Sequence, residues 1–267
     1  MTLQAKYERL QQILREMGSA LAAFSGGVDS TLLLKAAHDA LDEQVQAVTA
    51  WSKRYHELDE RELKQLTTAL DIRHHIIRYD EMNIPHFREN SPERCYYCKR
   101  WLFERFTQLA KEYALQVVVD GSNLDDVDDF RPGMRALQEL GVRSPLREAG
   151  LTKQEIRTLS QAMALPTWNK PAMPCLATRV PYYTEITSEV LRKVQAAEAY
   201  LKQLGFREFR VRHHDKIARI ELPRQDMIRV FQEQLDQPII AHFKEIGYTY
   251  ITLDLQGFRS GSMNEVL

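Results

Sequence analysis

The sequence predicts an α/β fold in which a parallel-sheet domain is followed by a second, smaller α+β domain. Three observations predict it. Short apolar runs alternate with segments of helical periodicity up to residue 164, as in βαβ units. A glycine turn joins the first apolar run to the helix after it. A stretch with four prolines at 166–183 then ends the alternation, so we expect domains at 1–181 and 182–267.

Each element of the first domain follows from its own residue pattern. Apolar residues at helical spacing predict helices over 2–17, from the glycine turn to Leu41, and over 56–70, 91–114 and 152–164. Apolar runs predict strands at 21–24, 45–50, 73–79 and 115–120, the last apolar enough to be buried on both faces. Ser91 and Pro92 are expected to begin one helix, and Thr152 with Glu155 to form a capping box on another.

Composition and charge exclude several classes of protein. The chain has 267 residues, with 36 Lys and Arg against 37 Asp and Glu, and 44% of its residues are hydrophobic. This argues against disorder and against a small disulfide scaffold, and it weakens any function that needs a broad basic face for nucleic acid. No apolar run approaches 18 residues, so we expect no membrane span. Three cysteines and no signal-peptide pattern predict a reducing cytoplasm.

The strongest motif is the glycine turn, SGGVDS at 25–30, between a strand and the start of a helix. Two successive glycines allow backbone torsions that expose N–H groups to anionic oxygens, and the helix dipole adds attraction for phosphate. The motif lacks the Gly-Lys-Ser/Thr ending of a Walker A loop and is not GxGxxG. It predicts a phosphate site with a carboxylate that can hold Mg²⁺. Its candidate ligands are Ser25, Gly26, Gly27, Asp29 and Ser30.

An acidic turn, DGSNLDDVDDFRPG at 120–133, follows the fourth predicted strand. Ligands of open α/β sheets bind at the carboxyl ends of the strands, and carboxylates placed there can hold Mg²⁺. Nearby basic residues can neutralise phosphates, although a solvated acidic loop explains any single carboxylate equally well. The residues concerned are Gly121, Asp125, Asp126, Asp128, Asp129, Arg131, Arg143 and Lys153.

The three cysteines are Cys95, Cys98 and Cys175. The first two lie three positions apart at a predicted helix start, which puts both sulfurs on one helix face and favours thiolates. Three thiolates from separate segments can hold an iron–sulfur cluster that keeps one open iron. A zinc site would need a fourth ligand, a redox pair would leave Cys175 unexplained, and buried inert thiols also remain open.

The second domain has a different order of elements: a helix at 187–204, strands at 207–214 and 216–222, helices across 224–246, and a strand at 248–254. Period 2 puts Arg210, Arg212 and His214 on one face of the predicted hairpin, with Arg219 and Glu221 extending it from the return strand. This patch suits a mononucleotide phosphate, as does Arg259 in the tail. A solvated strand face with salt bridges is the competing interpretation.

Several of these segments together resemble one family. SGGVDS resembles the PP-loop of the ATP pyrophosphatase superfamily, and the order of SGGVDS, DGSNLDDVDDFRPG, TWNKPAMPCLATRVPY, FRVRHHDKIARIELP and LDLQGFRSGSMNE is similar to that of LarE-type sulfur transferases. The resemblance implies cleavage of ATP to AMP and pyrophosphate, with adenine near Trp51 and Ser52. It implies adenylation of the carboxylates of pyridinium-3,5-dicarboxylic acid mononucleotide and their conversion to thiocarboxylates, for the nickel-pincer cofactor of lactate racemase.

The resemblance also implies roles for particular residues. Ser25–Ser30, Ser52, Gly121, Asp126 and Arg131 are expected to bind ATP and Mg²⁺, and Cys175, Asp29 and Arg179 to be catalytic. One branch of the family sacrifices the cysteine that matches Cys175, whereas a chain with all three cysteines resembles the branch with a 4Fe-4S cluster fed by a sulfide donor. The substrate phosphate is expected between subunits of a homo-oligomer. Its expected ligands are Glu198, Arg210, Arg212, Glu221 and Arg259.

Three other functions remain as alternatives. A tRNA thiolation enzyme shares the PP-loop, the cysteines and the adenylate chemistry, but the net charge of −1 and the 12 basic against 12 acidic residues of 182–267 argue against tRNA binding. An ATP-dependent amide-forming ligase with a structural zinc is the second. A non-catalytic nucleotide or iron sensor is the third.

Overall fold

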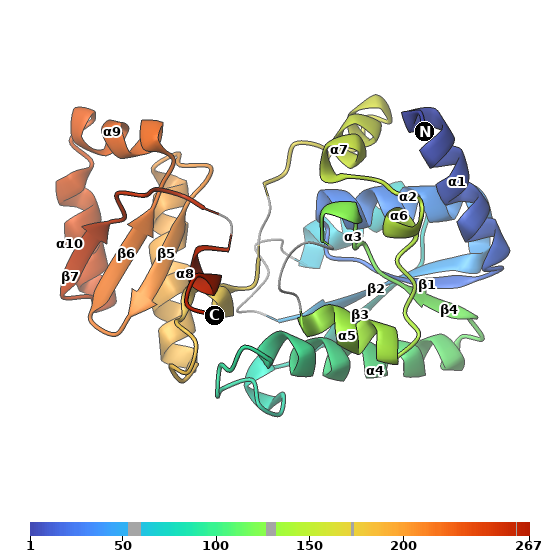
Figure 1. Cartoon of the computed structure of the whole chain (residues 1–267), viewed down its shortest axis with the longest axis horizontal. Helices are drawn as coiled ribbons and strands as arrows, with labels where there is room; N and C mark the ends of the chain where they lie inside the picture. The colour runs from blue at the N-terminus through green and yellow to red at the C-terminus, as the bar shows by residue number, and fades with distance from the viewer. Residues whose placement is uncertain (53–59, 127–131, 172–173, 260) are drawn as a thin grey trace. The chain divides into compact units, whose positions relative to one another are not determined.

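The computed structural model describes residues 1–52, 60–126, 132–171, 174–259 and 261–267. The chain packs as two compact units (Figure 1). Unit 1 comprises Met1–Ile84 and Cys95–Ala172, and unit 2 comprises Pro85–Arg94 and Met173–Leu267. Each unit has its own sheet and its own apolar core, so each is described by itself.

Unit 1 is built on a parallel four-stranded sheet with the strand order β3-β2-β1-β4. The strands are β1 (Ala20–Ala23), β2 (Val45–Trp51), β3 (His74–Arg78) and β4 (Val117–Val119). The helices are α1 (Leu3–Glu16), α2 (Val28–Leu41), α3 (Glu60–Ala69), α4 (Arg94–Glu112), α5 (Pro132–Glu139), α6 (Pro145–Glu148) and α7 (Lys153–Ala162). This confirms the predicted α/β class.

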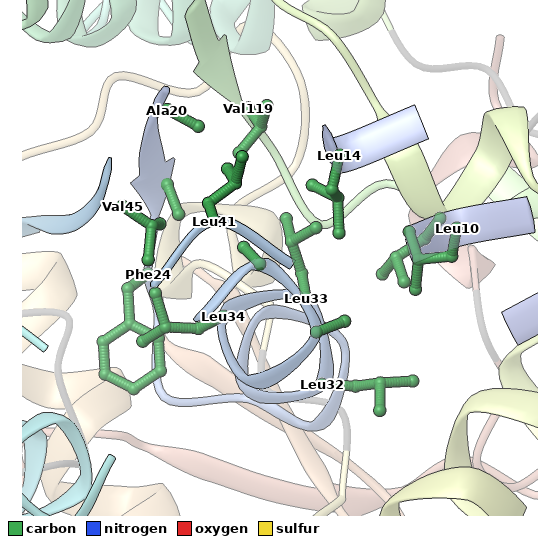
Figure 2. Close-up of a cluster of buried hydrophobic side chains, with 14 of the residues drawn as sticks. Leu10, Leu14, Ala20, Phe24, Leu32, Leu33, Leu34, Leu41, Val45 and Val119 are labelled. Atoms are coloured by element: carbon green, nitrogen blue, oxygen red, sulfur yellow. The ribbon is translucent and has the colours of Figure 1, made fainter. Parts of the chain in front are cut away.

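Successive residues of β1 point to opposite faces of the sheet, and each face has its own core. Ala20 and Ala22 pack in the cluster formed mainly by α1 and α2, which Figure 2 shows around Leu33 and Leu34. Leu21 packs on the other face, with side chains of α4 and α5. Helices on both faces explain why β1 and β4 are apolar throughout, and they fix the carboxyl end of β1, where the glycine turn begins.

Unit 2 contains a three-stranded sheet with the order β5-β6-β7. Its strands are β5 (Arg210–His214), β6 (Ile217–Glu221) and β7 (Tyr250–Leu253), with β5 antiparallel and β7 parallel to β6. Its helices are α8 (Ser188–Gln203), α9 (Arg224–Gln232) and α10 (Asp236–Ile246). Val211, Ala218 and Ile220 join the apolar core with Leu201 of α8 and Phe243 of α10. The other face of the hairpin therefore carries the charged side chains.

The structure differs from the sequence predictions at several element ends. Helix α4 begins at Arg94 and not at Pro92, because Ser91 to Arg94 form a turn closed by a hydrogen bond from the Arg94 N–H to the Ser91 carbonyl of 2.9 Å. Helices α5 and α6 were not predicted. The capping box of Thr152 and Glu155 on α7 is confirmed. Residues 56–59 of the predicted third helix lie outside the described residues.

The contacts divide the chain between residues 172 and 173, and the segment 85–94 packs with unit 2, whereas the domain boundary at 181/182 stays a prediction. Asn90 accounts for much of the packing of the segment 85–94 with unit 2. Its buried side-chain amide donates to the carbonyls of Val180, Pro181 and Thr184, so the residues before α4 are bound to the second unit. Within the described parts of the chain, no helix combines the length and apolar character needed to cross a membrane.

Candidate functional site

The motif at 25–30 forms the connection between β1 and α2. Gly26 has a φ of 72°, in the left-handed region that glycine adopts without strain, and Gly27 is the extended residue that caps α2. Among the described residues, no side chain caps this helix. The first N–H groups of a helix have no partner within it, and the helix dipole favours anions there. The turn therefore has the backbone of a phosphate site, as the sequence predicts.

Serine hydroxyls inside the turn hold its shape. The Oγ atoms of Ser25 and Ser30 lie 3.1 Å apart, and the Ser30 hydroxyl also donates to the Gly27 carbonyl at 3.2 Å. Thr31 donates to the same carbonyl at 2.8 Å from its side chain and at 3.0 Å from its N–H. The two predicted serine ligands are thus adjacent, on a turn whose backbone is fixed in advance.

Gly121, predicted to bind ATP, lies against the start of α2. A Cβ atom at this position would stand 3.2 Å from the backbone N of Ser30 and 3.4 Å from its Cα. Glycine therefore lets the chain after β4 approach the glycine turn closely, where a side chain would crowd the backbone of Ser30. The acidic turn and the SGGVDS turn are consequently neighbours at the carboxyl edge of the sheet.

Asp29 and Asp126, the predicted magnesium ligands, are joined through Asn123. The Asn123 side chain donates to Asp29 Oδ1 at 3.4 Å, and its backbone N–H donates to Asp126 Oδ2 at 2.9 Å. Lys153, the first residue of α7, forms an ion pair with Asp29. Its backbone N–H donates to Asp125 at 2.8 Å. One hydrogen-bonded network therefore holds both carboxylates. Asp128, Asp129 and Arg131 lie outside the described residues.

Asp120 is a residue of the site that the sequence analysis did not single out. It is buried at the end of β4, where its carboxylate accepts from Ser122 at 2.5 Å and from Ser144 at 2.6 Å. These bonds fix the start of the acidic turn. Asn123 was not predicted either. Both residues lie in the sequence DGSNLDD, but only tertiary contacts show which of its polar side chains connect the two turns.

Replacing Lys153 with methionine is expected to weaken ATP binding about tenfold, the effect of losing one charge-assisted contact to a phosphate or its metal. Lys153 forms an ion pair with Asp29 and so holds this carboxylate at the turn. Calorimetric titration with a non-hydrolysable ATP analogue and Mg²⁺ measures the change. Lys35→Met is the matched control, because Lys35 pairs with Asp39 on α2, the helix that also carries Asp29. Equal affinities of the two variants would contradict the assignment.

Ser52, predicted to lie near the adenine, is buried just after β2. Its hydroxyl donates to Glu81 Oε2 at 2.5 Å, and Glu81 is itself completely buried. The pair fixes the backbone that follows Trp51, whose carbonyl accepts from the Tyr79 N–H at 3.1 Å. An ordered main chain at this place is what base recognition needs; the contact with adenine itself stays a prediction.

Cys95 and Cys98 lie in the first turns of α4 and are half-buried, on one face of the helix. Cys175 is exposed and directly precedes a short 3-10 helix, Leu176–Arg179. The first two belong to unit 1 and the third to unit 2. Among the residues that the structure describes, no three His, Cys, Asp or Glu side chains gather as a metal site. The donor chemistry, three thiols of which two share a helix face, fits an iron–sulfur group.

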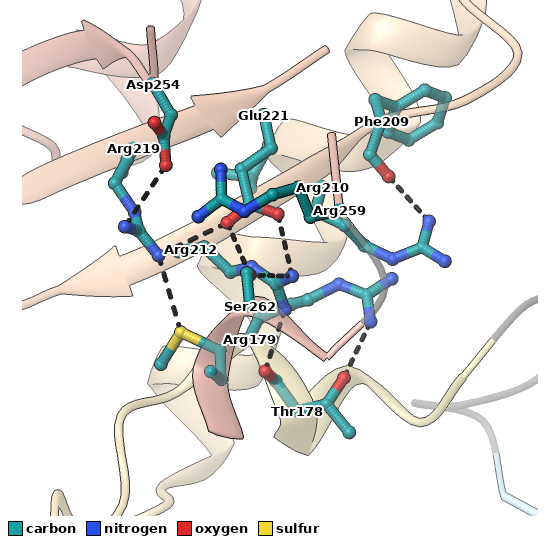
Figure 3. A network of polar contacts seen from close by, with 12 residues as sticks. Thr178, Arg179, Phe209, Arg210, Arg212, Arg219, Glu221, Asp254, Arg259 and Ser262 are labelled. Atoms are coloured by element: carbon teal, nitrogen blue, oxygen red, sulfur yellow. Dashed lines mark hydrogen bonds and ion pairs between the residues drawn. The ribbon is translucent and has the colours of Figure 1, made fainter. Parts of the chain in front are cut away.

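The charged face of unit 2 carries buried ion pairs. Arg179 binds Glu198 through two hydrogen bonds of 2.6 and 3.0 Å, and Arg212 donates to Glu221 at 2.7 Å (Figure 3). Both arginines and both glutamates are at most 5% exposed. The strand register that pairs Arg210 with Glu221 and Arg212 with Arg219 confirms the predicted shared face. We call this set the arginine cluster: Arg179, Arg210, Arg212 and Arg219 with Glu198 and Glu221.

Arg210 is the most perturbed member of the arginine cluster. Burial, and then the nearby positive charges of Arg179 and Arg212, lower the pKa of Arg210 to about 10. Its guanidinium lies 4.9 Å from the centre of the Phe258 ring. The group stays protonated at neutral pH, and an anion would relieve the repulsion among these cations. Arg259, the remaining predicted phosphate ligand, pairs with Glu265 at 3.1 Å.

The glycine turn between β1 and α2, with carboxylates at the same edge of a parallel sheet, defines a nucleotide-binding protein of the PP-loop ATP pyrophosphatase class. A family model described as queuosine biosynthesis protein QueC matches residues 19–90. This segment contains the glycine turn, β2 and β3, so the match supports the class from the part of the chain that forms the nucleotide-binding edge.

Relatives match the chain over nearly its full length. It is 38% identical over 271 residues to the pyridinium-3,5-bisthiocarboxylic acid mononucleotide synthase of Lactiplantibacillus plantarum, covering 100% of this chain and 96% of that protein. It is 41% identical over 265 residues to an uncharacterized protein of Synechocystis sp., covering 99% of each. An uncharacterized protein of Methanocaldococcus jannaschii is 30% identical over 240 residues. The chain therefore belongs to the family of this synthase, the LarE family of ATP-dependent sulfurtransferases.

Proposed function

We propose that the chain converts pyridinium-3,5-dicarboxylic acid mononucleotide to the bisthiocarboxylic acid mononucleotide, a step in assembly of the nickel-pincer cofactor. The observation that carries this proposal is the 38% identity to the synthase along the whole chain, unit 2 included. A match confined to the nucleotide-binding segment, such as residues 19–90, would support ATP use without a substrate.

ATP binds in this proposal with its phosphates on the N–H groups of the turn Ser25–Ser30. Asp29 and Asp126 hold Mg²⁺ beside them, and Lys153 adds a positive charge. A carboxylate oxygen of the substrate attacks the α-phosphate, pyrophosphate leaves, and the acyl adenylate forms. A sulfide sulfur then attacks the acyl carbon and AMP leaves with the former carboxylate oxygen, so that one C–O bond is replaced by one C–S bond.

Cys95, Cys98 and Cys175 would together hold a 4Fe-4S cluster. Such a cluster, with three protein thiolates, supplies one iron with an open position at which an external sulfur donor can bind. The helix start at α4 favours the thiolate form of the first two residues. The resemblance to the branch with three cysteines supports this part of the proposal, together with the shared helix face of Cys95 and Cys98.

The substrate phosphate binds to the arginine cluster and Arg259 in this proposal. Arg210 supports it, because its buried charge lies close to those of Arg179 and Arg212. The buried glutamates, Glu198 and Glu221, orient the guanidinium groups and offset part of their charge. A homo-oligomer and residence in the cytoplasm are also proposed, on the family resemblance and the cysteine content respectively.

The test of the proposed function is turnover of the purified chain with pyridinium-3,5-dicarboxylic acid mononucleotide, Mg²⁺-ATP and sulfide under anaerobic conditions. We expect AMP and pyrophosphate, and a product in which mass spectrometry finds sulfur in place of oxygen. Absence of pyrophosphate release with this substrate would contradict the proposal. Salt-dependent binding of tRNA in a gel shift would instead support the tRNA thiolation alternative.

Iron analysis tests the cluster separately from the reaction. Anaerobically purified wild-type chain is expected to contain about four irons and matching sulfide, and Cys98→Ser to lose them, because three thiolates are the ligands. Tyr97→Phe is the matched control in the same helical turn, and it should keep the iron. One zinc per chain, or iron retained in Cys98→Ser, would contradict the assignment of these cysteines as cluster ligands.

A further inference from the structure

The main chain of Cys175 is held by Thr178. The Cys175 carbonyl accepts two hydrogen bonds from this residue, one from its backbone N–H at 3.0 Å and one from its hydroxyl at 2.8 Å. Both bonds close the short 3-10 turn, Leu176–Arg179. The main chain of this exposed cysteine is therefore bound to a threonine three residues further on.

Thr178 is itself bound by two buried arginines. Arg179 Nη1 donates to the Thr178 hydroxyl at 2.7 Å, and Arg212 Nη1 donates to the Thr178 carbonyl at 3.0 Å (Figure 3). The hydroxyl thus accepts from an arginine and donates to the Cys175 carbonyl at the same time. The side chains that fix both guanidinium groups are Glu198 and Glu221.

The two arginines have different capacities for a further ligand. Every nitrogen of Arg179 has an acceptor: Nε and Nη2 donate to Glu198, and Nη1 donates to Thr178 and, at 3.4 Å, to Pro174. Arg212 differs, because its buried Nε has no hydrogen-bond acceptor among the described residues. An anion that accepts a hydrogen bond from this Nε leaves the contacts of both Nη atoms of Arg212 in place, including the one to Thr178.

We propose that Thr178 is a positioning residue that couples occupation of the arginine cluster by a phosphate to the orientation of Cys175. This inference rests on the proposed function, in which the substrate phosphate and the sulfur chemistry use these two places. A bound phosphate holds Arg212 more rigidly, Arg212 holds the Thr178 carbonyl, and Thr178 holds Cys175. Arg179 also acts as a positioning residue in this arrangement, through the Thr178 hydroxyl.

The test measures the alkylation rate of Cys175 by iodoacetamide in the reduced, chelator-treated full chain, with peptide mass spectrometry to separate it from Cys95 and Cys98. Inorganic phosphate is the probe. We expect phosphate to slow alkylation of wild-type Cys175 about fivefold. An effect of this size follows when one added hydrogen bond lowers the population of molecules in which the turn is loosened. Thr178→Val is expected to react about fivefold faster than wild type and to respond less to phosphate, because it loses the hydroxyl bond to the Cys175 carbonyl and keeps only the main-chain bond.

Thr178→Ser is the matched control, because it keeps the hydroxyl and should behave as wild type. Hydrogen exchange of β5 and β6 shows whether unit 2 of each variant is folded, and Thr178→Ala replaces the valine variant if it is not. A wild-type rate that does not respond to phosphate would overturn the coupling, and a wild-type rate in folded Thr178→Val would overturn the role of Thr178. Either result concerns the coupling alone. Failure of the proposed function would appear separately, as the absence of product in the turnover assay of the wild-type chain.

Discussion

Replacing Cys175 with serine is expected to reduce thiocarboxylate formation at least about a thousandfold while ATP is still cleaved in the presence of the dicarboxylate substrate. Losses of this order follow removal of a group that takes part in the chemical step itself. The glycine turn and its carboxylates belong to unit 1 and Cys175 to unit 2, so the change leaves the groups proposed to activate the carboxylate in place. Pyrophosphate release and product mass are the two measurements.

Thr178→Ser serves as the control for this variant, because it alters the same turn without removing a thiol. Equal loss of pyrophosphate release and of product in Cys175→Ser would contradict a role confined to sulfur transfer. Intact mass of the wild-type chain after turnover adds a second criterion. A loss of about 34 Da, one H₂S, would mean that Cys175 gives up its own sulfur. An unchanged mass with several products per chain favours a cysteine that is a cluster ligand.

Much of the fold could be predicted because its signals are local. Apolar runs as short as that of β1, beside a glycine turn and an amphipathic helix, already define a βαβ order. Helices α5 and α6 were missed for a physical reason. Each has at most 8 residues and lies in a segment rich in turn residues, so burial of Leu137 and Leu146 in the apolar cores stabilises these helices more than their own periodicity does.

The candidate site was predictable in identity and less so in geometry. The phosphate-binding chemistry of the glycine turn can be inferred from six adjacent residues, SGGVDS. By contrast, the bridge from Asp29 through Asn123 to Asp126, and the ion pair of Asp29 with Lys153, join segments far apart in the chain. Periodicity placed Arg210 and Arg212 on one face, but it could not show that buried Glu221 fixes the guanidinium group of Arg212, since that depends on the strand register.

Glu221→Gln is expected to destabilise unit 2 by about 3–5 kcal/mol, because it leaves the buried charge of Arg212 without its partner. Glu221 is completely buried, and its Oε1 also accepts from Arg219 at 3.2 Å and from Ser262 at 2.8 Å. Hydrogen exchange of the β5 and β6 amides measures the change. The loss of stability should be far larger than for a surface ion pair, because water cannot reach the position of a completely buried carboxylate.

Glu265→Gln is the control for Glu221→Gln. It removes the partner of Arg259 at an exposed position, 58% for the Glu265 side chain, and should change stability by no more than about 0.5 kcal/mol. Amides of β1 and β2 serve as an internal reference, as does tryptophan fluorescence, because all three tryptophans belong to unit 1. Faster exchange confined to β5 and β6 is expected. Equal exchange in the two variants would mean that the buried pair contributes no more than a surface one, and the arginine cluster would then owe its arrangement to the apolar packing beneath the sheet.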